Sequence, residues 1–215
     1  MDINWLGHAC VRLRTRQAAV LMDPAGREAG FDMGRPTADI VTISRHHPHH
    51  GHAGGVRGQP VIIDGPGEYE IEGVQLFGLP SPLARAGEDA ASERNTAYVV
   101  EAEGMHLAHL GSGCTPPRED EHGLFSEIDI LIVPIGGDES VAPERAARTV
   151  RDLEPTIVIP VGYDGPAAAG EQPAALRAFL DATGLSGGEP LARLSIRPRQ
   201  LGEEQRVVLL EASRR

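Results

Sequence analysis

Three apolar runs constrain the fold of this chain more than any other feature of its 215 residues. They read DIVTIS at residues 39–44, IDILIVP at 128–134 and PTIVIPVG at 155–162, and all three are rich in valine and isoleucine. Such runs are typical of strands covered on both faces, because a strand with one face in water alternates apolar and polar residues. The sequence therefore predicts a layered fold in which at least one sheet is enclosed.

The remaining pattern places more strands in the first half of the chain and helices in the second. PERAARTVRDL at residues 143–153 begins with proline and glutamate, which favour a helix start, and a second helix is expected at 173–183, before Gly184. In GPGEYEI, Gly65 and Gly67 suggest a tight turn beside Glu68 and Tyr69. Together these elements predict one domain, residues 1–215, with two sheets face to face and helices outside. The further strands are expected at residues 3–5, 10–14, 19–22, 60–63, 74–79, 96–101, 106–110, 191–196 and 206–210.

Composition narrows the classes of function. A net charge of −11 and a pI near 5.2 exclude broad binding to nucleic-acid phosphates, which needs a basic surface. No apolar run approaches the roughly 20 residues of a membrane span, and the N-terminus lacks the pattern of a signal peptide. The two cysteines, Cys10 and Cys114, are expected to be reduced thiols in the cytoplasm. The expected partners are a small-molecule ligand and further copies of the chain.

The most concentrated functional signal is SRHHPHHGHAGG at residues 44–55, which holds five of the nine histidines. Imidazole is a common ligand of Zn²⁺, Ni²⁺ and Cu²⁺. A catalytic zinc site has about three protein ligands and a bound water whose pKa falls from about 15.7 to about 7. The candidate metal ligands are His47, His49, His50 and His52. No Ser-His-Asp order, phosphate loop or dinucleotide-binding motif is recognisable in the sequence.

Several motifs in series carry a resemblance to a known family. DIVTISRHHPHH resembles the signature loop of the metallo-β-lactamase superfamily, in the branch of metal-dependent hydrolases similar to L-ascorbate-6-phosphate lactonase. WLGHAC, LMDP, DGPGEYEIEGV, NTAYVVE, HLGSG, ILIVPIGG and LEPTIVIPVGYD match that branch in order over residues 1–165. The resemblance implies an α/β fold, a four-layer αββα sandwich of two mixed sheets with outer helices, and a site for divalent metal, zinc above all.

The signature of that loop, S/T-H-x-H-x-D-H, is only partly kept. Alignment at Ser44 puts the three histidines at Arg45, His47 and His50 and the aspartate at His49. Arginine has no lone pair for a metal and brings a fixed positive charge. An alternative register starts at His47 and ends at His52. The first register is preferred because it preserves the spacing to DGPGEYEIEGV.

The other ligand positions of the family are also changed. The resemblance puts a further histidine at Leu83, the bridging aspartate at Ser112 and the last histidine at Gly162. Leucine and glycine side chains offer no ligand atom, and a serine hydroxyl binds Zn²⁺ poorly. Replacement carboxylates are expected, if anywhere, at Glu88 and Asp89.

Two more residues match positions that line the site in that branch. His8 would orient substrate, act as a base or serve structure alone. Asp23 would support the metal loop or simply form a turn after a strand.

These observations leave three hypotheses. In the first, the hydrolytic metal site is largely lost and the chain is a non-hydrolytic binding or interaction protein. In the second, it is a metal-dependent hydrolase of a small ester, lactone or phosphoester, with an atypical mononuclear histidine site and one weakly bound metal. In the third, it binds a transition metal without catalysis. A separate, open idea is that the Arg45 guanidinium fills the vacated metal position, which predicts that Arg45 points into the former metal site near His47 and Asp23.

Overall fold

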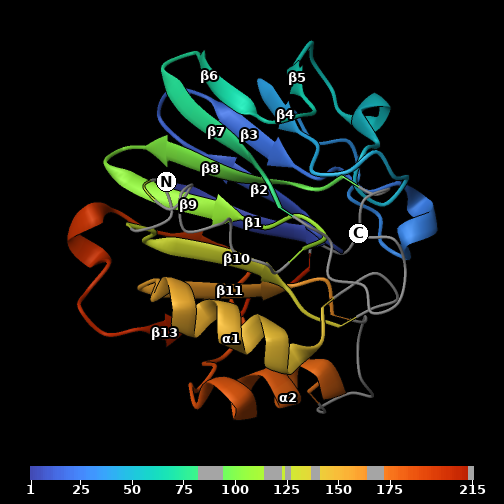
Figure 1. The fold of residues 1–215 in the computed structure, drawn as a ribbon. Coiled ribbons are helices and arrows are strands. Elements are labelled where there is room, and N and C mark those ends of the chain that lie inside the picture. Colours follow the sequence, from blue (N-terminus) through green and yellow to red (C-terminus); the bar gives the residue numbers. More distant parts are fainter. Residues whose placement is uncertain (82–93, 114–122, 124–126, 137–140, 164–171, 213–215) are drawn as a thin grey trace.

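The computed structural model describes residues 1–81, 94–113, 123, 127–136, 141–163 and 172–212, and its strands form two stacked sheets (Figure 1). The first sheet has the order β12-β1-β2-β3-β4-β5, and the second has the order β13-β11-β10-β9-β8-β7-β6. The strands of the first sheet are β1 (Asp2–Gly7), β2 (Cys10–Arg14), β3 (Ala19–Met22), β4 (Ile40–Thr42), β5 (Val61–Ile63) and β12 (Leu194–Ser195). Those of the second are β6 (Gly67–Ile71), β7 (Val74–Pro80), β8 (Thr96–Ala102), β9 (Met105–His109), β10 (Ile130–Pro134), β11 (Ile157–Val161) and β13 (Arg206–Val207).

Strand direction brings several loops to one edge of the molecule. In the first sheet β2 is antiparallel to both β1 and β3, and β4 is parallel to β3, so β1, β3 and β4 all end at the same edge. In the second sheet β9, β10 and β11 are parallel. Ligand sites of mixed and parallel sheets lie in the loops beyond the carboxyl ends of such strands. The segments that follow β1, β3, β4 and β9 are therefore the first place to look for a site.

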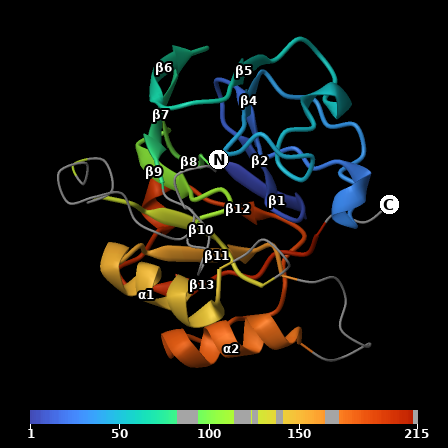
Figure 2. The ribbon, with the colours of Figure 1, turned by 45° about the vertical axis from the view of Figure 1, so that its right-hand side comes forward.

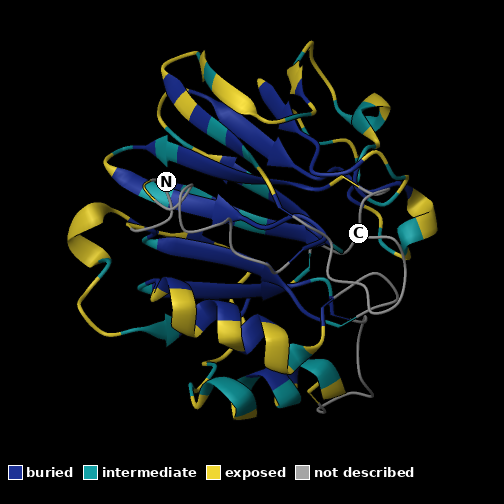
Figure 3. Cartoon of the chain, in the orientation of Figure 1, coloured by how far each residue is buried: buried dark blue, intermediate teal, exposed yellow. Residues whose placement is uncertain are grey.

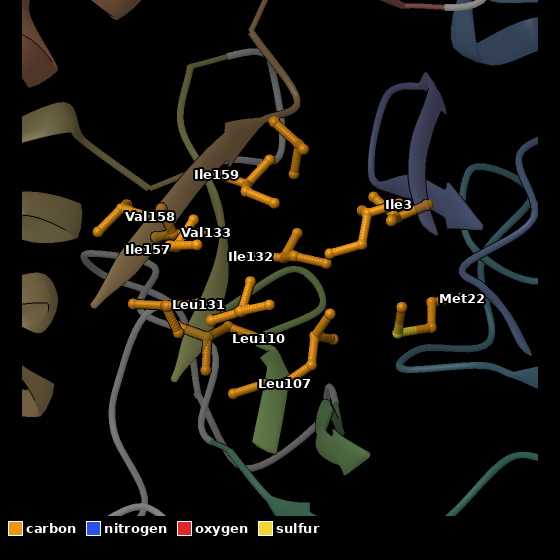
Figure 4. Packing of buried hydrophobic residues seen from close by; sticks show 14 of the residues in the cluster. Ile3, Met22, Leu107, Leu110, Leu131, Ile132, Val133, Ile157, Val158 and Ile159 are labelled. Carbon is orange, nitrogen blue, oxygen red and sulfur yellow. The ribbon is translucent and has the colours of Figure 1, made fainter. Parts of the chain in front are cut away.

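A single large core fills the space between the sheets and continues under the helices. Ile3 and Met22 of the first sheet belong to the same cluster as Leu107, Ile132 and Ile159 of the second (Figure 4). The strands of this core appear almost entirely buried in Figure 3, as the valine- and isoleucine-rich runs predict.

Both described α-helices cover the outer face of the second sheet (Figure 2). They are α1 (Pro143–Leu153), which buries Ala146, Ala147 and Val150, and α2 (Ala174–Thr183), which buries Phe179. Their exposed sides carry the charged residues, so both helices are amphipathic. Neither helix is long and apolar enough to cross a membrane.

The outer face of the first sheet is covered differently. Leu21, Val41 and Ile43 form a small second core there with residues from the loop that follows β3, including Met33. The short 3-10 helices η1 (Arg27–Ala29) and η2 (Ala53–Gly55) lie within these covering segments. Cys10 is buried in this cluster, where burial raises the pKa of its thiol to about 12 and keeps it neutral. A third 3-10 helix, η4 (Pro198–Gln200), follows β12.

The two-sheet sandwich and both helices are confirmed. The tight turn suggested by Gly65 and Gly67 corresponds to a bend at residues 65–66. The strand that follows it, β6, was not predicted; it holds Glu68 and Tyr69 and pairs with β7. A hairpin turn at Glu72 and Gly73 joins β6 to β7, and both residues have positive φ, as a two-residue turn of type I′ requires. The expected strands at 191–196 and 206–210 shorten to β12 and β13.

Tyr98 links the second sheet to the first. This residue of β8 is fully buried, and its hydroxyl donates to the carbonyl oxygens of Ile43, directly after β4, at 3.0 Å and of Ile63, the last residue of β5, at 3.3 Å. Burial raises the pKa of this phenol, so it remains a donor.

Removing that hydroxyl tests the link. Tyr98→Phe leaves buried carbonyl groups with less hydrogen bonding and is expected to lower the free energy of unfolding by about 1–2 kcal/mol in urea titrations. Tyr69→Phe is the matched control, because the Tyr69 hydroxyl donates to the carbonyl oxygens of Gly65 and Pro66, which lie directly before its own strand β6. Its expected cost is about 0.5 kcal/mol or less. Equal costs for the two variants would contradict the proposed role of Tyr98.

Candidate active site

The histidine loop follows β4 and is anchored to the segment that follows β3. The amide of Gly26 donates to Pro48 O at 3.0 Å, and the amide of His52 donates to Pro24 O at 2.8 Å. Within the loop, the amides of His50 and Gly51 both donate to His47 O, which forms a tight turn. The loop therefore has a defined shape, and that shape decides which imidazoles point inward.

The five histidines of the loop differ in exposure. His50 is 1% exposed, His47 and His49 are half-buried, and His46 and His52 are exposed. Only the register that starts at Arg45 places its last histidine in the interior. His52, which ends the alternative register, lies at the surface.

His50 stands between a carboxylate and a hydroxyl. Its Nδ1 is 2.8 Å from Asp23 Oδ2, and its Nε2 is 2.8 Å from Ser112 Oγ. All three residues are buried, at 1%, 1% and 5% exposure for Asp23, His50 and Ser112. The carboxylate accepts from Nδ1–H, and in a neutral imidazole Nε2 is then the acceptor for the serine hydroxyl. Asp23, His50 and Ser112 come from three separate loops and are joined in series by hydrogen bonds. This series is termed the Asp-His-Ser line.

The carboxylate of Asp23 is held by Ser44 as well as His50. The Ser44 amide donates to Oδ1 at 2.7 Å, and the Ser44 hydroxyl donates to Oδ2 at 2.6 Å. Burial by itself would raise the pKa of Asp23, but electrostatic interaction with His50, the hydrogen bond from His50, electrostatic interaction with His109 and the hydrogen bond from Ser44 together bring it below its ordinary value. Asp23 is therefore an anion that fixes the tautomer and orientation of His50.

Ser112 is positioned by Asn95, a residue that precedes β8. The Ser112 amide donates to Asn95 Oδ1 at 2.9 Å, and Asn95 Nδ2 donates to Leu110 O at 3.0 Å. Between them, Gly111 has φ +65 and no space for a side chain, because a Cβ there would lie 2.3 Å from Ser44 Cβ. The serine thus sits on a turn whose conformation is fixed by its neighbours.

Three half-buried imidazoles surround the outer side of His50. The ring of His8 lies 5.0 Å from that of His50 and 5.3 Å from that of His49, and His47 lies 4.7 Å from His49, all measured between centroids. His8 and Asp23 both have positive φ, at 49° and 47°. Such a conformation costs a non-glycine residue about 1 kcal/mol or more, and it is often found at functional sites. The described residues that adopt it elsewhere, Glu72, Glu103 and Glu154, lie at hairpin turns and a helix end.

His109 supports the site from β9 without taking part in the cluster. Its Nε2 lies 2.9 Å from Ala9 O, and its Nδ1 accepts from the Gly111 amide at 3.2 Å. Burial lowers its pKa, so this imidazole is neutral with its proton on Nε2. It ties the end of β9 to the loop that carries His8.

The described residues do not fit the metal centre that the family implies. Among them, no group of three His, Cys, Asp or Glu side chains is arranged to hold a metal ion. Both ring nitrogens of His50 face protein groups, and Arg45 is buried at the start of the loop with its fixed positive charge. Gly162 lies at the end of β11 with φ +77 and has no side chain to offer. Leu83, Glu88, Asp89 and Cys114 lie outside the described residues.

The predicted site residues are thus partly brought together. His8, Asp23, His47, His49, His50 and Ser112 converge, whereas His52 lies apart at the surface. Arg45 is buried and not turned out to solvent; the direction of its guanidinium stays a prediction. The sequence analysis missed the Asp-His-Ser line and the supporting roles of Ser44 and Asn95. The motifs LMDP and HLGSG contain Asp23 and Ser112, but no local sequence pattern indicates that residues so far apart in the chain form hydrogen bonds with a common histidine.

The crowding around Gly111 yields a prediction. Gly111→Ala forces a Cβ against Ser44 and Asn95, which should displace Ser112 from His50 and lower the free energy of unfolding by about 2–4 kcal/mol. Gly104→Ala is the control, because its φ of +73 is similar and no atom lies within 4 Å of its Cβ position. Its expected cost is about 1 kcal/mol. Thermal and urea unfolding of both variants measures the difference, and equal costs would show that the turn is not tightly packed.

Comparison with known proteins agrees with this architecture. Residues 2–162 match the family described as Beta-lactamase superfamily domain. A UPF0173 protein of Pyrococcus furiosus is 30% identical over 186 residues, covering 76% of this chain and 83% of its own, and a UPF0173 metal-dependent hydrolase of Methanopyrus kandleri is 26% identical over 201 residues, covering 76% and 84%.

Solved structures show the same likeness. A protein of Thermotoga maritima assigned to the Zn-dependent hydrolases of the metallo-β-lactamase superfamily superposes with a TM-score of 0.72 at 27% identity, covering 97% of each chain. Its likeness extends over both sheets and the helices. By sequence and by fold, this chain belongs to the β-lactamase superfamily domain family.

Proposed function

We propose that this chain is a hydrolase that cleaves an ester, lactone or phosphoester of a small molecule at the edge where His8, Asp23, His50 and Ser112 meet. The observation that carries the proposal is the hydrogen bond between Asp23 and His50. It orients the His50 imidazole so that Nε2 is directed at the Ser112 hydroxyl, 2.8 Å away. Hydrolysis needs a base of this kind to remove a proton from the attacking oxygen.

The electrostatics of the site suit that role. When His50 takes up a proton, the buried Asp23 carboxylate stabilises the imidazolium, and Ser44 holds the carboxylate in place. The same proton can then be returned to the leaving oxygen. The half-buried ring of His8 lies 5.0 Å from that of His50, measured between centroids, and a substrate would approach His50 from this side.

The relatives support hydrolysis over a non-hydrolytic role. Several proteins similar to this chain over most of their length are named metal-dependent hydrolases, and the Thermotoga maritima protein is assigned to Zn-dependent hydrolases. The hypothesis of a binding protein that has lost hydrolysis is therefore less well supported than its hydrolase alternative. The relatives' names also support a divalent metal, but the donors described above do not fit one.

Variants of the Asp23–His50 pair test the proposed base. His50→Gln removes the base, and Asp23→Asn removes the charge that orients it, so each is expected to lower kcat for p-nitrophenyl acetate by about 10²- to 10⁴-fold. His46→Gln is the matched control, because His46 lies in the same loop but is exposed beside Asp64. Thermal unfolding checks that each variant is folded. Full activity in folded His50→Gln would show that this imidazole is not the base.

Chelation separates the two routes to hydrolysis. Treatment with EDTA followed by desalting is expected to leave hydrolysis of p-nitrophenyl acetate unchanged, with far less than one metal ion per chain by elemental analysis. The reason is that His50, the central imidazole, already uses both nitrogens within the protein. Loss of activity that added Zn²⁺ restores would instead assign the chain the metal-dependent mechanism for which its relatives are named.

A further inference from the structure

We propose that Ser112 is a nucleophile that forms a covalent acyl intermediate, so that this fold carries out serine-based hydrolysis of a carboxylic ester or lactone. The inference rests on the hydrolase function proposed above and adds the attacking atom and the substrate class. The observation behind it is the line Asp23–His50–Ser112, in which both hydrogen-bond distances at His50 are 2.8 Å. That line has the geometry by which a serine hydroxyl is activated by a neighbouring base that a third group orients.

The roles follow from the atoms that face one another. Asp23 cannot donate as an anion, so the proton of the Asp23–His50 bond is on Nδ1. In the neutral imidazole Nε2 then carries a lone pair, and the partner at that position is a hydroxyl that can donate to it. The two remaining hydrogen bonds on Asp23 come from Ser44 and prevent the carboxylate from turning away.

Ser112 is held as a preorganised nucleophile must be. Its amide is fixed by Asn95, and the amide of Gly113 donates to Leu110 O at 3.2 Å, which closes the turn. Gly111 leaves no room for the turn to shift. Fixed positioning of the attacking atom is a large part of catalytic rate enhancement.

A purely structural network would also be buried and hydrogen bonded, but two features distinguish this one. The turn that carries His8 and the start of the loop at Asp23 both hold a non-glycine residue at positive φ, a strained conformation that clusters at functional sites. In addition, the ring of His50 contacts His8, which is half-buried, so the network reaches a solvent-accessible group. A network that served only to fill the core would be expected deeper between the sheets.

The chemistry balances with residues and water alone. The hydroxyl proton of Ser112 passes to His50 Nε2 as Oγ bonds to the carbonyl carbon, and the proton then goes to the leaving alkoxide as the C–O bond of the ester breaks. Water next gives a proton to His50 and attacks the acyl carbon. The bond from Oγ to that carbon breaks, and His50 returns the proton to Oγ. The products are an acid and an alcohol, which remain one molecule when the substrate is a lactone.

The substrate class follows from this route. A serine paired with a neutral imidazole is suited to attack at a carbonyl carbon. A phosphoester would bring negative charge to a site with the buried anion Asp23 at its centre, in a chain of net charge −11. Uncharged esters and lactones avoid that repulsion.

Covalent labelling of the unmodified chain tests the proposal. The protein is incubated with a fluorophosphonate, its intact mass is recorded, and the labelled residue is found by peptide mapping. One phosphonyl group on Ser112 is expected, together with a burst of p-nitrophenol of about one per chain when p-nitrophenyl acetate is added. Ser112→Ala should lose the label, the burst and at least about 100-fold in turnover. Ser186→Ala, at an exposed serine in the turn after α2, should lose none of them.

The outcomes separate this inference from the proposed function. Hydrolysis that is fast and depends on His50, without label or burst at Ser112, would overturn the serine nucleophile and leave the hydrolase intact. A label on another serine would also overturn it. If the protein shows no hydrolysis and takes up no label, both proposals are overturned. Because the labelled residue is located in the unmodified protein, the result holds even where Ser112→Ala folds poorly.

Discussion

The buried carboxylate of Asp23 is the interaction on which the site depends. It accepts the amide and hydroxyl of Ser44, at the end of β4, and faces Nδ1 of His50, six residues further along the same loop. Burial of an anion costs free energy unless hydrogen bonds compensate it, so these contacts hold the loop in one conformation. The loop in turn places His50 beside Ser112, which comes from the other sheet. One carboxylate thereby joins the two halves of the sandwich at the edge where their strands end.

The same arrangement explains how a member of this family can lack the expected donors and still retain the parts of a hydrolytic site. In metal sites, a carboxylate commonly orients the far nitrogen of a ligating histidine. Asp23 and His50 are in that relationship here, but Nε2 meets a hydroxyl where the family resemblance places a bridging aspartate. A carboxylate-oriented imidazole is useful both as a ligand and as a base. Exchange of its partner from a metal to a serine would change the mechanism without rebuilding the scaffold.

Much of the fold could be predicted from the sequence because its signals are local. The runs at β4, β10 and β11 are apolar on both faces, and α1 begins and ends as its first-turn proline and apolar spacing predict. Strand β6 was missed because its residues are exposed on an edge, where hydrophobic periodicity is weak. The four-layer description follows from family resemblance; the described α-helices both lie on the second sheet, and the first is covered by loops.

The sequence by itself determined the strands, the helices, the family and the concentration of histidines in one loop, since each is written in contiguous residues. It also identified His8, Asp23, His50 and Ser112 as separate site positions through resemblance. Only the tertiary structure decided that three of them form a line, that His52 lies outside, and that Asn95 and Gly111 hold the serine in place. The reason is physical. Hydrogen bonds between residues 23, 50 and 112 depend on the stacking of two sheets, and no local pattern records the distance between chain segments that meet only after folding.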